Sequence, residues 1–396
     1  MKRIEHKLFL LAALAILAGA CTSDNGQDAT INPGERLVTL ALSVPGTPAS
    51  RGLGADENAI KSVDVLLFTT GTDYFYYRAV GTIDKVSNDK FTVRLPEDTW
   101  NVVVLANARE ALNDASYPHK SLLTPATPAP GGSTVTRADV LDNLLLHVTE
   151  KWPEGGTFKG IPMWGYYNDL LIGAGTASPV DVDPTRAIAR VNISLSTEAE
   201  GNFALASARL YNYSRAGSIA PAVHASAGAN VDGYEGEQWQ YVDDHYKAVA
   251  THLPEFIDPI PPLKTFGPIV YDIDPAPADP VYKYKEEIYT FEAGEGKDET
   301  LDKNTCLVIG GYYKESGAPT YPTDATYYRV DFIKGDGTTY LPLLRNHSYN
   351  VVIKSVDGEG EPTAAGAFSN RPVNLLARVL EWEDGGIGDI VFDGQN

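Results

Sequence analysis

Basic residues are scarce in this chain of 396 residues, in which 32 lysines and arginines stand against 52 aspartates and glutamates. The formal net charge of −20 repels the phosphates of nucleic acids and of anionic membrane surfaces, which excludes both as electrostatic partners of the folded chain. Cysteine is nearly absent, and two residues cannot form a disulfide framework or a multi-thiolate metal site. A hydrophobic core must therefore hold the fold, and the length and 43% hydrophobic content allow about two to three domains.

The sequence also lacks the motifs of common enzymes. It contains no H-E-x-x-H, no G-x-S-x-G, no phosphate-binding G-x-x-x-x-G-K-S/T and no G-x-G-x-x-G. Cys306 lies in an apolar run and is expected to be a buried structural residue rather than a nucleophile. The spacing of His224, His245 and His252 matches no recurrent zinc site, and we interpret them as solvated loop residues. We therefore expect no catalytic residue, no cofactor and no metal, and a protein that is not an enzyme.

Long apolar runs are missing except at the start of the chain. Residues 8–17 are apolar, basic residues precede them, and small residues lead directly to Cys21. This run is too short to span a bilayer, and the pattern predicts a lipoprotein signal peptide over residues 1–20. Cys21 would be acylated and would anchor the exported precursor at the outer membrane, so that the membrane is a partner only through this lipid. The alternative is an ordinary secretory signal with a cysteine there by chance.

The rest of the chain has the pattern of β-strands. Apolar and polar residues alternate in several segments that are rich in branched and aromatic residues, and short apolar runs lie between them. These segments are 38–44, 63–68, 91–95, 102–106, 188–195, 306–309, 327–332, 349–356 and 373–380. The 36 glycines and 26 prolines leave little room for long helices, although 138–147 has spacing compatible with a short one. A mainly β fold of two sandwiches follows.

The sequence indicates where these two sandwiches meet. Residues 180–184, Val-Asp-Val-Asp-Pro, separate a segment rich in glycine and aromatics from the next clear strand. We expect one sandwich over 52–183 and a second over 184–396. Residues 216–280, dense in glycine, proline and polar residues, are interpreted as a long surface insertion in the second.

The first strand of the exported chain is followed by a loop suited to proteolysis. Its alternating residues are Val38, Leu40, Leu42 and Val44, and the small and turn-forming residues after them include one basic residue, Arg51. Such loops are accessible to proteases. Cleavage of the Arg51–Gly52 bond would detach the strand, and four apolar side chains at roughly 1.5 to 3 kcal/mol each would make the empty groove costly by about 6 to 12 kcal/mol. Residues 21–51 would then be a propeptide.

The C-terminal region, residues 373–393, offers a segment that could fill this groove in another copy. Two apolar extended stretches there are separated by Glu-Asp-Gly-Gly. The donor residues would be Val373, Leu375, Ala377 and Val379 in the first stretch, or Ile387, Ile390 and Phe392 in the second. Donation from head to tail makes a heterologous contact that propagates as a filament. The alternative, that both termini pair within their own domains, stays open from the pattern alone.

Several motifs in order along nearly the whole chain resemble the FimA-like fimbrillins of the Bacteroidales. They are the small residues that lead to Cys21 (the lipobox), the first strand with its arginine-bearing loop, and the segments 62–68, 161–165, 186–191 and 345–351 before Trp382. The resemblance implies two transthyretin-like β-sandwich domains in tandem, export as a lipoprotein, cleavage by an arginine-specific surface protease, and polymerisation with other copies and related subunits into an adhesive cell-surface fimbria. Arg36 is a second candidate for cleavage, but a cut there would leave the strand attached.

Other functions remain open at this point. A glycan-binding surface lipoprotein would use aromatic platforms, and the chain has 22 tyrosines, although adjacent tyrosines in strands point to opposite faces and suit sheet packing. A tip or accessory adhesin would explain the 216–280 insertion, whereas the patterned C-terminus favours a stalk subunit. A secreted hydrolase is disfavoured by the missing motifs.

Overall fold

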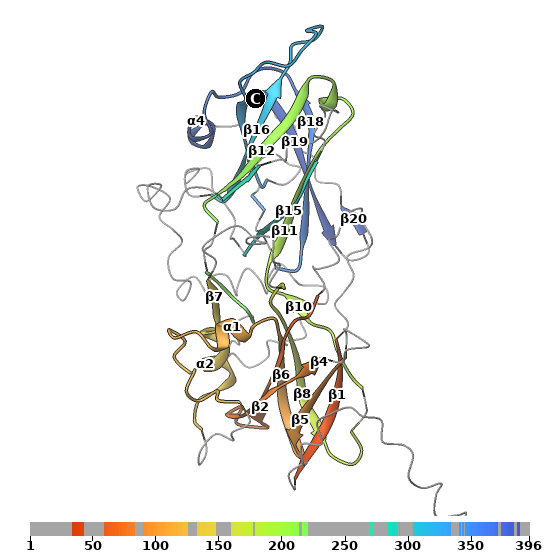
Figure 1. Ribbon diagram of the computed structural model, residues 1–396, viewed down its shortest axis with the longest axis vertical. Coiled ribbons are helices and arrows are strands. Elements are labelled where there is room, and N and C mark those ends of the chain that lie inside the picture. Colours follow the sequence, from red (N-terminus) through yellow and green to blue (C-terminus); the bar gives the residue numbers. More distant parts are fainter. Residues whose placement is uncertain are drawn as a thin grey trace, which may run out of the picture.

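The protein is mainly β, as a computed structural model shows (Figure 1). The fold described here covers residues 34–42, 59–83, 90–125, 133–147, 160–176, 179–213, 216–220, 269–272, 284–291, 293, 304–333, 340–341, 343, 345–370, 374–383 and 386–388. Two pairs of sheets, one in each half of the chain, lie along the long axis of the molecule (Figure 1). The predicted mainly β fold class is confirmed.

The first half of the chain forms a sandwich of a four-stranded and a five-stranded sheet. The four-stranded sheet has the order β4 (Thr82–Ile83), β5 (Lys90–Pro96), β1 (Glu35–Leu42), β9 (Val180–Val182). The five-stranded sheet has the order β10 (Thr185–Arg186), β8 (Met163–Ile172), β6 (Asp98–Ala106), β2 (Val63–Thr69), β3 (Phe75–Val80). Because side chains alternate along a strand, each sheet turns one apolar face inward, and these faces form a shared core.

A third layer covers the outer face of the five-stranded sheet. It contains α1 (Arg109–Leu112), α2 (Arg137–Asp142) and β7 (Leu145–His147), whose apolar side chains pack on Leu66 and Val103 of the sheet. The helix expected over 138–147 is therefore correct only in its first part. It begins at a capping box, in which Thr136 and Asp139 bind each other's backbone N–H groups, and it gives way to a strand after Asn143.

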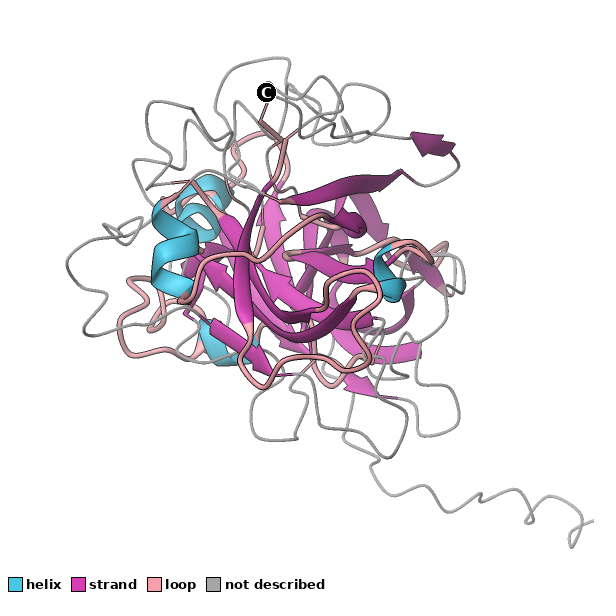
Figure 2. Cartoon of the chain, turned by 90° about the horizontal axis from the view of Figure 1, so that it is seen from above, coloured by secondary structure: helices cyan, strands magenta, loops and turns pink. Residues whose placement is uncertain are grey.

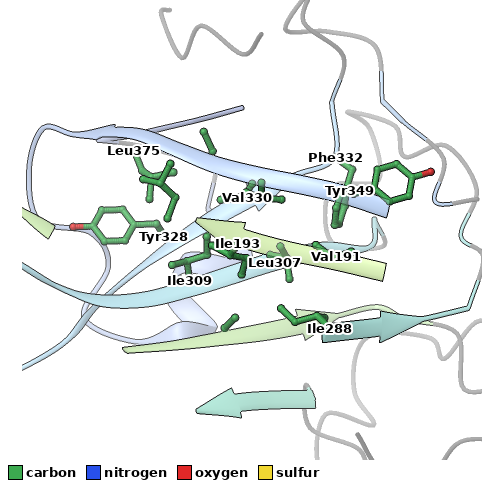
Figure 3. Close-up of a cluster of buried hydrophobic side chains, with 14 of the residues drawn as sticks. Val191, Ile193, Ile288, Leu307, Ile309, Tyr328, Val330, Phe332, Tyr349 and Leu375 are labelled. Atoms are coloured by element: carbon green, nitrogen blue, oxygen red, sulfur yellow. The ribbon is translucent and has the colours of Figure 1, made fainter. Parts of the chain in front are cut away.

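The second half of the chain forms another sandwich. One sheet has the order β15 (Tyr284–Thr290), β11 (Ala189–Leu195), β18 (Ser348–Val356), β19 (Leu375–Glu383), β20 (Gly386–Gly388), and the other β14 (Ile269–Asp272), β12 (Phe203–Tyr211), β16 (Cys306–Tyr313), β17 (Thr326–Asp331). Figure 3 shows their core, where Val191 and Tyr349 of one sheet meet Leu307 and Val330 of the other. A single 3-10 turn (Ala199–Gly201) precedes β12, and α4 (Ala364–Ser369) packs on the outer face of β16.

The segment predicted as a surface insertion is structured at both ends, so the prediction is wrong there. Its first residues form β13 (Ala216–Ser218), which pairs with β7 of the first half. Ile219 and Ala220 are buried in the same core as α1 and α2, and β14 extends the sheet of β12. Apolar side chains that contact the other sandwich override the loop-like composition of the segment. The three histidines of the insertion lie outside the described residues.

Sheet pairing continues slightly beyond the expected junction at residue 183. β10 pairs with β8, and Ile188 is buried in the first core, whereas β11 begins the second sandwich at Ala189. In the view from above, the helices lie toward the sides of the group of strands (Figure 2). None of the helices in the described part of the chain is long and apolar enough to cross a membrane.

Candidate functional site: the N-terminal strand and its neighbours

β1 is an interior strand of its sheet and not an edge strand. Its residues 35–41 pair with β5 in an antiparallel ladder from Glu35 opposite Pro96 to Ala41 opposite Lys90. On its other side, residues 40–42 pair in parallel with Val180–Val182 of β9. The strand order β4-β5-β1-β9 means that only β1 connects β5 to β9, as Figure 1 shows for β1 and β5.

Alternate side chains of β1 enter the core of the first sandwich. Val38, Leu40 and Leu42 are 3%, 1% and 3% exposed, whereas Leu37 on the opposite face is 55% exposed. The predicted alternation of this strand is confirmed for these three residues. Val44 lies outside the described residues. Loss of β1 would therefore uncover both apolar side chains across the core and the backbone groups of its two neighbours.

The start of β1 is held by a surface ion pair. Arg36 Nε lies 2.6 Å from Glu97 Oε1, and both side chains are about half exposed. Arg36 is also the partner of Leu95 in the ladder with β5. The backbone of Arg36 is therefore part of the sheet.

The strand β9 is a part of this site that the sequence analysis did not recognise. Residues 180–184 were interpreted only as a separator between domains, but Val180 and Val182 are buried beside β1. The hydroxyl of Tyr167 donates to the carbonyl of Asp181 and links β9 to β8 of the opposite sheet. Burial, with smaller contributions from Asp183 and Asp181, raises the pKa of Tyr167, which keeps this donor protonated. The alternation Val-Asp-Val was the signal for a strand.

The C-terminal strands pair within their own sandwich. β19 lies between β18 and β20, with a ladder to β18 that runs from Leu375 opposite Val356 to Trp382 opposite Ser348. Leu375 and Ala377 are buried in the second core. β20 is the outermost strand, and its Ile387 pairs with Trp382. Several predicted site residues lie outside the described part of the chain: Cys21, Arg51, Gly52, Val373, Ile390 and Phe392. Val379 lies in β19.

The described residues offer little chemistry elsewhere. No group of three or more histidine, cysteine, aspartate or glutamate side chains within the described ranges is arranged to hold a metal. Cys306 is fully buried in β16, as expected, and burial raises the pKa of its thiol, with Arg329 acting in the opposite direction. A thiol kept protonated in this way is a poor nucleophile.

Comparison with known proteins supplies a relative. No family model matches the chain. A segment of 88 residues is 30% identical to the major fimbrium tip subunit FimE of Porphyromonas gingivalis. The chain resembles Bacteroidales fimbrial subunits. The match covers 22% of this chain and 15% of the length of FimE, so the role of that whole protein comes to this chain only as a proposal.

Two solved structures of fimbrial proteins were also found in the comparison. The fimbrilin FimA of P. gingivalis W83 is 14% identical, with a TM-score of 0.48 over 91% of this chain and 98% of FimA. The tip fimbrial protein Mfa3 of P. gingivalis, with a C-terminal truncation, is 14% identical, with a TM-score of 0.45 over 88% of this chain and 99% of Mfa3. At this level of similarity, neither structure decides what this chain does.

Proposed function

We propose that this protein is a structural subunit of a cell-surface fimbria that supports adhesion. It is exported as a lipoprotein acylated at Cys21, cleaved after Arg51 by an arginine-specific surface protease, and polymerised by β-strand donation between copies. The observation that carries the proposal is the interior position of β1 between β5 and β9. The match to a fimbrial subunit over part of the chain agrees with it.

Arg51 is the better cleavage site of the two arginines that flank β1. A protease binds its substrate as an open, extended segment. Arg36 is a poor substrate because its backbone pairs with β5 and its side chain forms an ion pair with Glu97. Arg51 follows β1 in a stretch of proline, glycine, alanine and serine. A cut after Arg51 separates β1 from the rest of the chain, whereas a cut after Arg36 leaves most of β1 attached.

Removal of β1 would leave a site that needs a replacement strand. The three buried side chains Val38, Leu40 and Leu42 contribute about 5 to 9 kcal/mol in total at 1.5 to 3 kcal/mol each. The exposed backbone groups of β5 and β9 add to this cost because they lose their partners. A strand from another copy would replace both the buried apolar side chains and the backbone partners of β5 and β9. Repetition of this contact builds a filament.

The second C-terminal stretch is the better donor of the two. β19 is an interior strand, and its departure would take Leu375 and Ala377 out of the second core. Among the described strands, β20 pairs with β19 alone, so its departure leaves β19 paired with β18. Ile390 and Phe392 alternate as a strand requires. The longer ladder of the site is the antiparallel one with β5, so the donor enters with the polarity of β1.

The proposal is tested by limited trypsin digestion of a chain that begins at Thr22, followed by N-terminal sequencing and electron microscopy. Cleavage after Arg51, loss of β1 and filaments are expected. Arg51→Ala abolishes both cleavage and filaments, and Arg36→Ala is the matched control that changes neither. Complete removal of residues 22–51 that leaves only monomers would overturn the proposal.

A second candidate is a tip subunit, because the curated relative is a tip subunit. A tip subunit accepts a strand or caps a filament but does not need to donate one. Deletion of residues 386–396 distinguishes the two roles. Loss of self-polymerisation after this deletion, with incorporation into filaments of the full-length chain retained, supports the stalk role. A chain that forms no filaments by itself either before or after the deletion supports the tip role.

A further inference from the structure

Asn107 uses its whole side-chain amide to hold the segment that precedes β2. Its Oδ1 accepts from the backbone N–H groups of Lys61 at 2.7 Å and Ser62 at 3.3 Å. Its Nδ2 donates to the carbonyls of Ala59 and Ile161, each at 2.9 Å. Its own backbone N–H donates to the carbonyl of Ser62 at 2.9 Å. One side chain therefore fastens residues 59–62 to the chain beside Ile161.

The local backbone is shaped around this amide. Asn107 follows the last residue of β6 and has a φ of +55°, a left-handed conformation that asparagine tolerates better than most residues. Gly160, with a φ of +91°, lies so close that a Cβ at its position would be 2.5 Å from Asn107 Nδ2. Both positions combine an unusual conformation with a close approach, which indicates that the arrangement is specific.

The segment that Asn107 holds is the first described part of the chain after the proposed cleavage site at Arg51. Ile60 is buried in the first core, whereas Lys61 beside it is exposed. Ser62 leads directly into β2, an interior strand between β6 and β3. After cleavage, residues 59–62 would be the described segment that joins the new N-terminal part of the chain to β2.

We propose that Asn107 is a positioning residue for processing, which fixes the new N-terminal segment so that cleavage removes β1 without loosening β2. This inference rests on the proposed function. Lys61 is the next basic residue after Arg51 and a potential second cleavage site for trypsin. While the N–H of Lys61 and the carbonyl of Ala59 are bound to Asn107, this segment cannot open to enter a protease.

The test uses Asn107→Gly, which removes all four side-chain hydrogen bonds but accepts the positive φ without strain. Asn107→Asp keeps the acceptor and removes the two bonds donated by Nδ2. Asn101→Ala is the matched control, because Asn101 lies in β6, the strand that Asn107 follows, and its amide binds Asp73 and Asp169 instead. Each variant is digested with trypsin and sequenced from its N-terminus, and hydrogen exchange is measured at residues 59–62.

In the wild type and in Asn101→Ala, the trimmed chain is expected to begin at Gly52. In Asn107→Gly, the exchange rates of the Lys61 and Ser62 amides should rise about tenfold or more, because the loss of several hydrogen bonds shifts local opening. A second product should then begin at Ser62, and Asn107→Asp should give an intermediate yield of it. Thermal unfolding of the uncut variants shows whether the whole fold is retained.

Failure of the proposed processing and failure of the proposed role of Asn107 give different results. A wild type that is not cut after Arg51 contradicts the proposed processing and leaves the exchange measurement to judge Asn107. A folded Asn107→Gly variant with unchanged exchange at residues 59–62 and a single product beginning at Gly52 overturns the role of Asn107, even when cleavage after Arg51 proceeds normally.

Discussion

Leu40 pairs with Val180 across a parallel ladder, although the two residues belong to segments far apart in the sequence. This pairing makes β1 an interior strand, because its other side is occupied by β5. A strand at the edge of a sheet could be lost with little effect. An interior strand with three buried apolar side chains cannot be lost without replacement.

The contribution of β1 to stability can be measured with Leu40→Ala. In the uncut protein this substitution should lower the free energy of unfolding by about 2 to 5 kcal/mol, the usual cost of emptying a buried leucine site. Leu37→Ala, on the exposed face of the same strand, should cost less than about 0.5 kcal/mol. Urea denaturation of the two variants provides the measurement, and equal effects would contradict the burial of Leu40 in the first core.

The buried ion pairs of the five-stranded sheet give a second prediction. Asp64 is fully buried, and its carboxylate accepts from Arg78 at 2.8 Å and from Arg109 at 3.0 Å. Asp64→Asn leaves a buried guanidinium without its counter-charge, so it should cost about 3 to 5 kcal/mol by urea denaturation. Glu97→Gln breaks only the exposed pair with Arg36 and should cost at most about 1 kcal/mol. A cost for Asp64→Asn that is no larger than this would show that the network contributes little.

Two deletions at the C-terminus test which segment is the donor. Removal of residues 386–396 should leave the monomer folded and abolish polymerisation, since β20 pairs only with β19 among the described strands. Removal of residues 374–396 also takes β19, with Leu375 and Ala377, out of the core and should lower the midpoint of thermal unfolding markedly. Circular dichroism and electron microscopy distinguish them. Filaments formed by the shorter deletion would assign donation to another segment.

Cys306 should be inert in the folded protein. Burial raises the pKa of its thiol, so the reactive thiolate is scarce at neutral pH, and the side chain is also inaccessible. A thiol reagent added to a chain that begins at Thr22 should therefore react only as the protein unfolds in urea. Rapid reaction in buffer would contradict the burial of this side chain.

The strands were predictable because their signal is local. The alternation of Val38, Leu40 and Leu42 follows from one buried face, and it needs no knowledge of the neighbours. The neighbours themselves were not predictable, because the partner of β1 on one side, Val180–Val182, is a short strand that reads as a linker. Pairing between distant segments depends on the whole fold rather than on either segment.

The sequence pattern also could not predict buried ion pairs or the hydrogen bonds by which one side chain holds distant segments together. Asp64 is a charged residue within an apolar strand, and the sequence pattern does not indicate that Arg78 and Arg109 are its partners. Asn107 sits at the end of an apolar run like any turn residue, and its four contacts come from segments on both sides of it in the sequence. Such roles exist only after the fold has brought the partners together.

The central claim is that the tail of one copy takes the place of β1 in another. Lys90 of β5 lies opposite Ala41, at the end of β1, and Asp389 and Asp393 flank the apolar residues of the tail. A zero-length carbodiimide cross-link between these groups, in filaments grown from mixed heavy-isotope and normal trimmed protein, tests the claim most directly. The account predicts peptides that join Lys90 of one isotope to a tail aspartate of the other, and none before trimming. Cross-links that form only within single copies would contradict it.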